Sequence, residues 1–327
     1  MGERIKKRSL RCLNILQRIL TAIPIFIGVT AVVYILMSLA PGSALDILSD
    51  SDTKLSAAQY DELKASLGLD QPVAVRYLIW LGSFLRGDLG VSYRSNQEVS
   101  TIIAQRILPS LLLTGSGVLL AILLAVPIGI MAAYKPYSKW DSASTFLALA
   151  GSALPGFFIS ILGIYIFSIK LGLLPSKGMY DISDQTVFSY IRHLIMPASV
   201  VCLGSMGGLI KQTRGACLEV FHEEYIKTAR SKGISEWQVV ISHAFRNALI
   251  PVVTSVLLEI PHIIGGSTIT EQIFGWPGVG SLMISSINNR DYPVVMGVAV
   301  LIATAVLITN IILDIVYAFL DPRITYE

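Results

Sequence analysis

The chain has little charge and few cysteines. Of its 327 residues, 14% are charged and 53% are hydrophobic, whereas an average soluble domain is about 25% charged. The three cysteines, Cys12, Cys202 and Cys217, lie far apart, so neither a disulfide framework nor a cysteine metal site is expected. The low charge and the long apolar runs place the chain among integral membrane proteins.

The sequence also lacks the short motifs of common catalytic sites. It has no GxxxxGK[ST] phosphate loop, so P-loop binding of ATP is not expected, and no HExxH, GxSxG or paired-cysteine motif. The net charge of +3 gives no support to nucleic-acid binding. The four histidines, His193, His222, His243 and His262, are scattered, so we predict no metal site. With the catalytic motifs missing as well, we predict no cofactor and no catalytic activity in this chain.

Six apolar runs are long enough to cross a hydrocarbon core of about 30 Å as helices. The first, residues 19–39, follows a basic leader at residues 1–18 and is too long to be the apolar core of a signal peptide. The other five are residues 110–134, 142–169, 194–210, 249–269 and 293–319. Several of the runs contain a mid-helix proline, namely Pro24, Pro127, Pro155 and Pro261. Lipid tolerates these prolines only because neighbouring helices or water can satisfy the freed carbonyl groups.

Small residues cluster at two places in these runs. One cluster is Gly204, Ser205, Gly207 and Gly208, and the other is residues 265–267, Gly-Gly-Ser. Small residues let helix backbones approach closely in a membrane. We interpret both clusters as sites of close packing, with a gating hinge as the alternative.

The distribution of Lys and Arg predicts the orientation, because cytoplasmic loops carry an excess of them. The leader, the short loop at 135–139, the loop at 211–248 and the C-terminal tail hold more basic residues than the opposite short loops. Both termini and the 211–248 loop are therefore expected in the cytoplasm, and residues 40–109 outside. The expected fold is an all-α polytopic membrane protein with six transmembrane helices.

The external segment, residues 40–109, has helical patterns of its own. Ser56 is placed to cap a helix that Gly68 ends. Residues 87–90, Gly-Asp-Leu-Gly, indicate a turn. Between them, residues 69–86 form a second amphipathic stretch, which fits either the membrane surface or packing on the external ends of the spans and carries Tyr77, Trp80 and Phe84.

Two acidic residues, Glu259 and Asp314, lie within expected spans. An ionisable group at membrane depth usually faces a cavity or a partner. Glu259, three residues before His262, fits either a polar pathway or a hydrogen bond between helices. Asp314 lies near the cytoplasmic end of its run and is expected to reach water.

The cytoplasmic loop at 211–248 is the best candidate for a functional surface. Helix-forming residues dominate 223–232, and Gly233 is placed to end that helix. Ser235 and Gln238 resemble a capping box that opens a second helix. A short helix, a glycine break and a second helix would form a rigid elbow, able to transmit a push from a soluble partner to the fifth span. The alternative is an ordinary amphipathic loop at the membrane interface.

This loop resembles the EAA loop of bacterial ABC-importer permeases, most closely in the dipeptide/oligopeptide/nickel branch. There it reads Y-x-x-TARAKG, then a helix, then H-A-x-RNA-x-x-P. Ser231 replaces the usual alanine, and Lys227, Thr228 and Ala229 stand where the general pattern has Glu-Ala-Ala. Residues 68–93, 171–178, 274–280, 289–295 and 320–324 are also similar to that branch, so the resemblance covers nearly the whole chain.

The resemblance implies a type I ABC-importer permease fold, with its core domain at residues 110–327. It implies one of two transmembrane subunits of an ATP-driven importer in the cytoplasmic membrane of a bacterium or archaeon. The expected cargo is a di- or oligopeptide, with a nickel or metal chelate as the alternative. The implied partners are a second, homologous permease forming a heterodimer, one or two cytoplasmic ATPase subunits that carry ATP and Mg, and an external solute-binding protein.

The resemblance also implies roles for particular residues. Segments 40–109, 172–190 and 271–291 would receive the solute-binding protein. Glu259 and His262 are candidates for the pathway. The residues that would support the coupling loop are His243, Arg246, Asn247 and Pro251. The coupling helix that docks on an ATPase would contain Glu224, Tyr225, Thr228, Ala229, Arg230, Lys232 and Gly233.

Three other functions remain as alternatives. An ion-coupled secondary carrier is disfavoured by the lack of inverted repeats and of an acidic relay. A membrane-embedded enzyme is disfavoured by the missing catalytic motifs. A receptor or assembly role is open, because transport folds host other functions.

Overall fold

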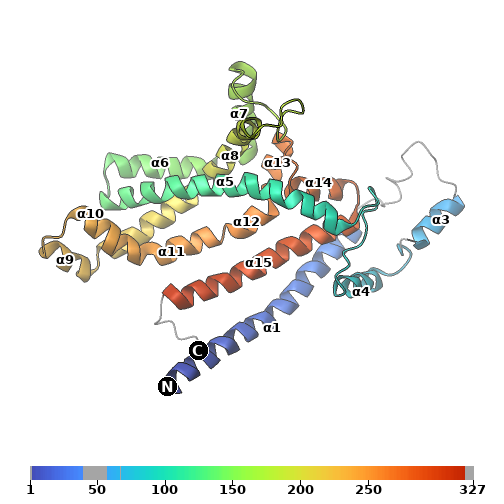
Figure 1. Cartoon of the computed structure of the whole chain (residues 1–327), viewed down its shortest axis with the longest axis horizontal. Coiled ribbons are helices and arrows are strands. Elements are labelled where there is room, and N and C mark those ends of the chain that lie inside the picture. The colour runs from blue at the N-terminus through green and yellow to red at the C-terminus, as the bar shows by residue number, and fades with distance from the viewer. Residues whose placement is uncertain (1, 40–56, 67, 321–327) are drawn as a thin grey trace. The chain divides into compact units, whose positions relative to one another are not determined.

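The computed structural model describes residues 2–39, 57–66 and 68–320 (Figure 1). In these residues the only β-type pairings are isolated bridges between Val91 and Glu98 and between Asp181 and Asp184. The all-α prediction is confirmed. The helices, with π-helices marked η, are α1 (Gly2–Leu39), α3 (Ala57–Ser66), α4 (Val73–Phe84), α5 (Val99–Tyr134), α6 (Lys139–Ala153), α7 (Gly156–Gly163), η1 (Ile164–Lys170), α8 (Val187–Phe221), α9 (Glu224–Ser231), α10 (Glu236–Gln238), η2 (Val239–Phe245), α11 (Arg246–Leu257), α12 (Ile260–Gly265), α13 (Thr268–Phe274), α14 (Val279–Asn288) and α15 (Tyr292–Leu320).

Five stretches of helix in the described residues are long and apolar enough to cross a membrane, and a sixth span exists if one bent pair is counted. The stretches in α1 and α15 lie close to the predicted runs, whereas those in α5 and α8 extend well beyond them into more polar sequence. The five stretches are Leu20–Leu39, Val99–Tyr134, Val187–Phe221, Arg246–Gly265 and Tyr292–Val316.

The sequence analysis expected one transmembrane helix at 142–169, but the structure has two helical stretches there. They are Lys139–Ala153 and Gly156–Lys170, whose axes meet at 96°, and Figure 1 shows α7 turning away from α6. Pro155 causes the break, because a proline disfavours helical backbone in the residue before it. Leu154 accordingly has φ −81° and ψ 125°.

The other three prolines named above differ in whether they lie inside a helix or at its start. Pro24 and Pro127 lie inside helices, as predicted. Pro261 instead lies in the first turn of α12, after a break at Glu259. A proline is tolerated there because the first N–H groups of a helix have no intrahelical partner.

The chain forms two compact units, the first comprising residues up to Leu108 together with Leu282–Ile311, and the second comprising Pro109–Ser281 with the residues from Ile312 onward. In the second unit, α8 is the central helix and packs against α6 and α11. Its contact with α5 is close as well, because a Cβ added at Gly129 would lie 3.0 Å from the Ile210 carbonyl oxygen.

The pair formed by α6 and α8 has the closest backbone approach. A Cβ added at Gly207 would lie 2.5 Å from the Ala148 carbonyl oxygen, and one at Gly151 would lie 2.6 Å from the Leu203 carbonyl oxygen. Toward one end of the pair, Arg214 donates to both carboxylate oxygens of Asp141, at 2.6 and 2.9 Å. Only 6% of the Asp141 side chain is exposed, so this paired charge is buried between the helices.

The predicted close packing of small residues is thus realised at Gly207 but not at its neighbours. Nothing lies within 4 Å of a Cβ added at Gly204 or Gly208, so that face of α8 is open in this chain. The second cluster is closely packed at Gly266, where an added Cβ would lie 3.0 Å from the Ser110 hydroxyl of α5. Gly266 has φ +76° and ends α12, and a Cβ there would overlap the Glu271 carboxylate.

In the first unit, α4 packs along α1. The Tyr77 hydroxyl donates to the Ile27 carbonyl oxygen at 3.1 Å, and Phe84 stacks on Phe26. Of the two placements considered for the amphipathic stretch 69–86, the structure has it packed on a span. The helix end at Gly68 (φ +64°) and the glycine turn at 87–90 agree with the predictions, whereas Ser56 lies outside the described residues.

Candidate functional site

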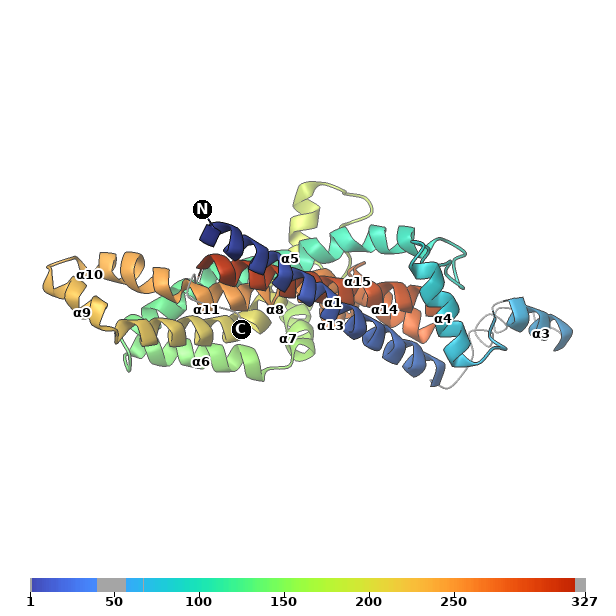
Figure 2. The same ribbon diagram turned by 90° about the horizontal axis from the view of Figure 1, so that it is seen from below.

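The predicted elbow is present as three consecutive helical segments. Helix α9 (Glu224–Ser231) is followed by Gly233 with φ +74°, and α10 then leads through η2 into α11. Left-handed backbone of this kind favours glycine, because a Cβ would meet the following carbonyl oxygen. Figures 1 and 2 both place α9 beside α10, at the end of α8 and α11.

The inner face of α9 is apolar. Ile226 is fully buried and Ala229 is 6% exposed, and both pack against Val239 and Ala244 of η2. The spacing of three residues puts Ile226 and Ala229 on one side of the helix. This small cluster fixes α9 against the helix that follows it.

The outer face of α9 is polar and exposed. Lys227 pairs with Glu224 at 2.7 Å, and Arg230 pairs with Glu236 at 3.1 Å. Exposed pairs of this kind contribute at most about 1 kcal/mol, so they order the surface more than they stabilise it. The predicted site residues on this exposed side are Glu224, Tyr225, Thr228, Arg230, Lys232 and Gly233, whereas Ala229 belongs to the buried face.

Among the predicted supporting residues, Asn247 has the clearest contact with α9. Its side chain hydrogen-bonds Tyr225, while burial raises the pKa of the Tyr225 hydroxyl above its usual value. Arg246 and Asn247 begin α11, and Pro251 lies inside that helix. The side chain of His243 lies outside the described residues.

The expected capping box is formed only in part. Ser235 is the N-cap of α10, but its side chain makes no hydrogen bond to the backbone of the helix. Its hydroxyl instead lies 3.4 Å from the Gln238 side-chain oxygen. The sequence analysis also missed Glu236, the partner of Arg230, because these residues are brought together by the turn at Gly233.

A second apolar cluster connects the elbow to the long helices. Val240 of η2 and Ala248 of α11 pack with Ile130 and Ala133 of α5 and with Ala216 and Cys217 of α8. The π-helical segment therefore has two packed sides, one against α9 and one against α5 and α8. Through η2, the α9 helix is thus in packed continuity with these two long helices.

The two pathway candidates differ in their surroundings. Glu259 lies at the break between α11 and α12, and its carboxylate accepts a hydrogen bond from Ser205 of α8 at 3.1 Å. His262 is exposed. Ser205 adjoins the open face of α8, where Gly204, Gly208 and Gly215 add no side chains and Lys211 and Gln212 are exposed. The sequence analysis selected Gly204, Ser205 and Gly208 as a packing cluster, and the structure adds Lys211, Gln212 and Gly215 to the same open face.

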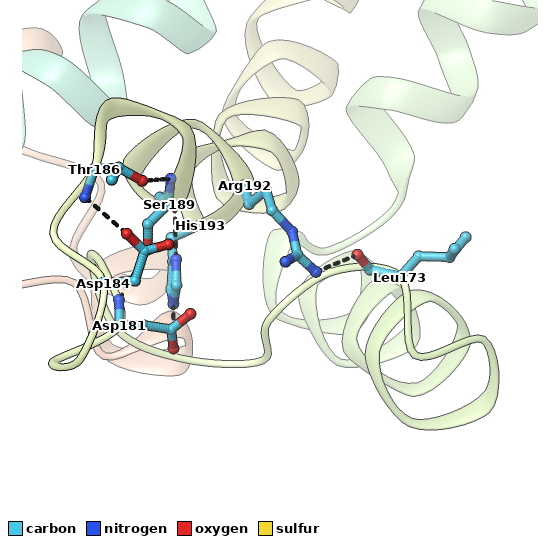
Figure 3. A network of polar contacts seen from close by, with 7 residues as sticks. All are labelled: Leu173, Asp181, Asp184, Thr186, Ser189, Arg192 and His193. Atoms are coloured by element: carbon cyan, nitrogen blue, oxygen red, sulfur yellow. Dashed lines mark hydrogen bonds and ion pairs between the residues drawn. The ribbon is translucent and has the colours of Figure 1, made fainter.

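At the other end of α8, the loop before it is held by its own polar contacts (Figure 3). Arg192 donates to the Leu173 carbonyl oxygen at 3.0 Å, and His193 Nε2 lies 3.9 Å from the Asp181 carboxylate. The Ser189 hydroxyl accepts from the Asp181 N–H at 3.0 Å. These contacts give segment 172–190 a defined shape, as a docking surface requires.

Glu271 organises the neighbouring segment. Its buried carboxylate accepts hydrogen bonds from the Ser110 hydroxyl at 2.7 Å and from the Ser281 N–H at 2.8 Å. A Cβ at Gly278 would overlap this carboxylate. The Trp276 indole donates to the Pro109 carbonyl oxygen at 2.8 Å. The FGWPGVG stretch is thus tied to the start of the α5 span.

No group of three or more His, Cys, Asp and Glu residues in the described parts of the chain is arranged to hold a metal ion. The arrangement contains a polar elbow and a membrane helix with an open small-residue face.

Two family models match the chain. Residues 125–326 match "Binding-protein-dependent transport system inner membrane component", and residues 11–114 match the N-terminal region of such membrane components. An oligopeptide transport system permease protein of Bacillus subtilis (strain 168) is 41% identical over 95% of this chain and 99% of its own length. A putative peptide permease protein of Brucella suis biovar 1 is 40% identical over 94% and 98%. A dipeptide transport system permease protein of Escherichia coli (strain K12) is 33% identical over 96% and 98%.

Proposed function

The chain belongs to the inner membrane components of binding-protein-dependent transport systems and is a permease subunit of an ABC importer, and we propose that its cargo is a di- or oligopeptide. The three relatives described above carry peptide, oligopeptide or dipeptide transport in their names. None of those names mentions nickel, so the metal-chelate alternative is not favoured. Family membership likewise disfavours the secondary carrier and the membrane enzyme.

The elbow is the proposed docking site for a cytoplasmic ATPase subunit. The observation that carries this proposal is the two-sided packing of η2, with Ile226 and Ala229 on one side and the α5–α8 cluster on the other. The exposed face of α9 is then free to enter a groove of the ATPase. On this proposal, both termini and the elbow lie in the cytoplasm, and residues 40–109 lie outside.

Coupling requires that the ATPase contact α9 differently in its two nucleotide states, because attachment alone shifts no equilibrium. In the proposed cycle, ATP and Mg bind to the ATPase subunits, which close and move α9. The η2 segment passes this movement to α5 and α8. The pore then changes from the inward-facing to the outward-facing state, and ATP hydrolysis returns it to the inward-facing state. This chain supplies the lever and half of the pore.

The open face of α8 is the proposed wall of the pathway. Residues 204, 208, 211 and 215 share one side of the helix, and the three glycines among them leave room for a bulky solute. Glu259 and His262 would add polar groups beside it. A second, homologous permease would close the pathway from the opposite side, and the solute-binding protein would deliver cargo to segments 40–109, 172–190 and 271–291.

The docking proposal is tested with Gly233→Trp and Gly233→Ala in the complete transporter. Both replacements strain the left-handed backbone by about 1–2 kcal/mol, and nothing lies within 4 Å of a Cβ there, so they differ mainly in bulk. We expect Gly233→Trp to abolish uptake and to separate ATP hydrolysis from transport, while Gly233→Ala keeps most of the coupling. Equal coupling in the two variants would show that no partner covers this position.

The cargo proposal is tested by purifying the transporter with its solute-binding protein and identifying the bound solute by mass spectrometry. A short peptide is expected, and addition of that peptide should increase ATP hydrolysis in reconstituted vesicles. A bound nickel chelate, with no stimulation by peptide, would contradict the cargo and leave the permease assignment intact.

A further inference from the structure

Unit 1 contains a small aromatic pocket that the proposed transport function does not use. It has a volume of about 190 Å³ and lies between α1, α4 and the start of α15. At about 30 Å³ per water molecule, it has room for a phosphate group. Its lining includes Tyr34, Arg76, Ile79, Trp80, Tyr93 and Tyr292.

Arg76 is the only charged residue in the lining. Its guanidinium lies 5.8 Å from the ring centre of Tyr34 and 5.7 Å from that of Tyr292, and it hydrogen-bonds the Tyr34 hydroxyl. No carboxylate of the described residues forms an ion pair with it. Aromatic faces hold an arginine in place without neutralising its charge. The lining therefore carries one positive charge held between two rings, while the nearest carboxylate, that of Asp291, accepts hydrogen bonds from the Ser92 hydroxyl and the Tyr93 N–H.

Two further hydrogen-bond donors line the pocket. The Trp80 Nε1–H is buried and has no hydrogen-bond partner among the described residues. Burial raises the pKa of Tyr93 to about 12, so its hydroxyl keeps its proton and can donate. A buried donor without an acceptor is costly. An anion with several oxygen atoms would satisfy the charge and the donors together.

The pocket lies at the depth of the membrane interface. Tyr34 is five residues before Leu39, where the first span ends, or about 7.5 Å along the helix at 1.5 Å per residue. Tyr292 is the first residue of the last span. Tyrosine and tryptophan collect at this depth, beside the lipid headgroups.

The surface beside the pocket is apolar. Ile79, which lines it, is 56% exposed, and its neighbour Leu78 is 63% exposed. An acyl chain could lie along these side chains while the headgroup occupies the pocket. A carboxylate from a soluble protein would match the charge but not this exposed apolar border, which favours a lipid.

We propose that this pocket binds the phosphate group of a phospholipid, in the leaflet at the Leu39 end of α1. Arg76 would carry the ionic contact, and the Trp80 indole would donate a hydrogen bond to a phosphate oxygen. The bound lipid would fasten α4 and the start of α15 to α1. The proposal rests on the membrane placement of the spans and not on the cargo, so a wrong cargo leaves it standing.

The test uses the complete transporter, purified in detergent, and native mass spectrometry to count retained phospholipids. Short-chain phosphatidylglycerol is then titrated back, and an uncharged galactolipid without phosphate is titrated in parallel. We expect Arg76→Gln to weaken phosphatidylglycerol binding at least tenfold and Trp80→Phe to weaken it a few-fold. Arg86→Gln, at an exposed position just after α4, is the matched control and should bind as the unmodified protein does.

Three results would overturn the proposal. One is equal phosphatidylglycerol affinity in Arg76→Gln and Arg86→Gln, and another is equal binding of the galactolipid. The third is weaker docking of the solute-binding protein in Arg76→Gln with lipid binding unchanged, which would assign the pocket to an acidic side chain of that partner. If Arg76→Gln does not fold, Trp80→Phe decides, since the aromatic ring and its packing remain.

Discussion

The α6–α8 pair and the elbow, defined as α9 with α10 and η2, both belong to the second unit, but they are held together in opposite ways. The first is joined by backbone contacts at Gly151 and Gly207 and by the buried Asp141–Arg214 pair. Helix α9 of the elbow is held against η2 by one small apolar cluster, and the ion pairs of the elbow are exposed. Close packing suits an element that moves as a rigid body, whereas exposed polar groups suit one that exchanges partners.

The difference shows where the chain can tolerate change. Interiors without free volume transmit strain, because any added atom must displace a neighbour. The elbow surface can lose a side chain with little effect on folding, although its contacts with a partner would suffer. Four substitutions test this contrast, two in each region.

The largest effect is expected for Gly207→Leu. The new side chain would meet the Ala148 backbone and the Ser152 side chain. Overpacking costs about 1–3 kcal/mol, and about 3 kcal/mol or more is expected here because the backbone must move. Gly208→Leu is the control, because nothing lies within 4 Å of its Cβ. We expect Gly207→Leu to lower the thermal stability of the solubilised protein strongly and Gly208→Leu to leave it nearly unchanged. Equal loss in the two variants would contradict the close approach of α6 and α8.

Arg214→Gln should have the next largest effect, because it leaves the buried Asp141 carboxylate without its cation. Breaking a buried pair costs about 3–5 kcal/mol, and we expect about 2–4 kcal/mol here since 29% of the Arg214 side chain is exposed. The double variant Asp141→Asn, Arg214→Gln should recover part of the loss. Denaturant unfolding in detergent measures both, and strictly additive effects would indicate that the two side chains do not act as a pair.

Ile226→Ala is expected to act locally. It removes a fully buried side chain from the cluster under α9, and such truncations cost about 2–5 kcal/mol. We expect faster hydrogen exchange in residues 224–245 with little change in the long helices. Ile241→Ala, at a side chain that is 42% exposed, is the control and should leave the exchange of the elbow unaltered.

The smallest effect on folding is expected for Arg230→Ala. Its pair with Glu236 is exposed, so the free energy of unfolding should change by less than about 1 kcal/mol. Coupling of ATP hydrolysis to uptake should nevertheless fall several-fold if α9 contacts an ATPase subunit. Lys64→Ala, in the last turn of α3, removes a positive charge elsewhere and should not alter coupling. A fall in stability without a fall in coupling would show that Arg230 acts only within the elbow.

Much of the fold could be predicted from local sequence. Long apolar runs gave the spans, since a helix is one of few structures that satisfies its own backbone in lipid. Gly68 and Gly233 were recognised as helix ends, and both have positive φ. These features depend on a few neighbouring residues, which is why a single sequence sufficed.

Other features depend on contacts between distant residues and could not be predicted. Gly207 and Gly208 are adjacent glycines that the sequence alone does not distinguish. The position of α6 decides that Gly207 is packed and that Gly208 is open. A proline at 155 predicts a disturbance, but the angle of 96° depends on what surrounds α7. Arg76 meets Tyr34 and Tyr292 because α4 lies beside α1.

The same holds for the candidate site. The exposed residues of α9 followed from the motif and the helical period, whereas Ala229, which was expected to dock, is buried against η2. The contact between Ser205 and Glu259 joins α8 to the break after α11. A residue 54 positions away in sequence gives no local signal of its contact.

The π-helical turn at Val239–Phe245 sets the angular phase between the elbow and α11. One additional residue in a helix rotates everything beyond it by about 100°. The π-helical turn therefore rotates the side chains of α10 relative to those of α11 without ending the helix. A deletion of one residue inside 239–245 would keep the helix from α10 to α11 continuous. It would, however, rotate α9 away from a groove of a partner protein that is shaped to receive it.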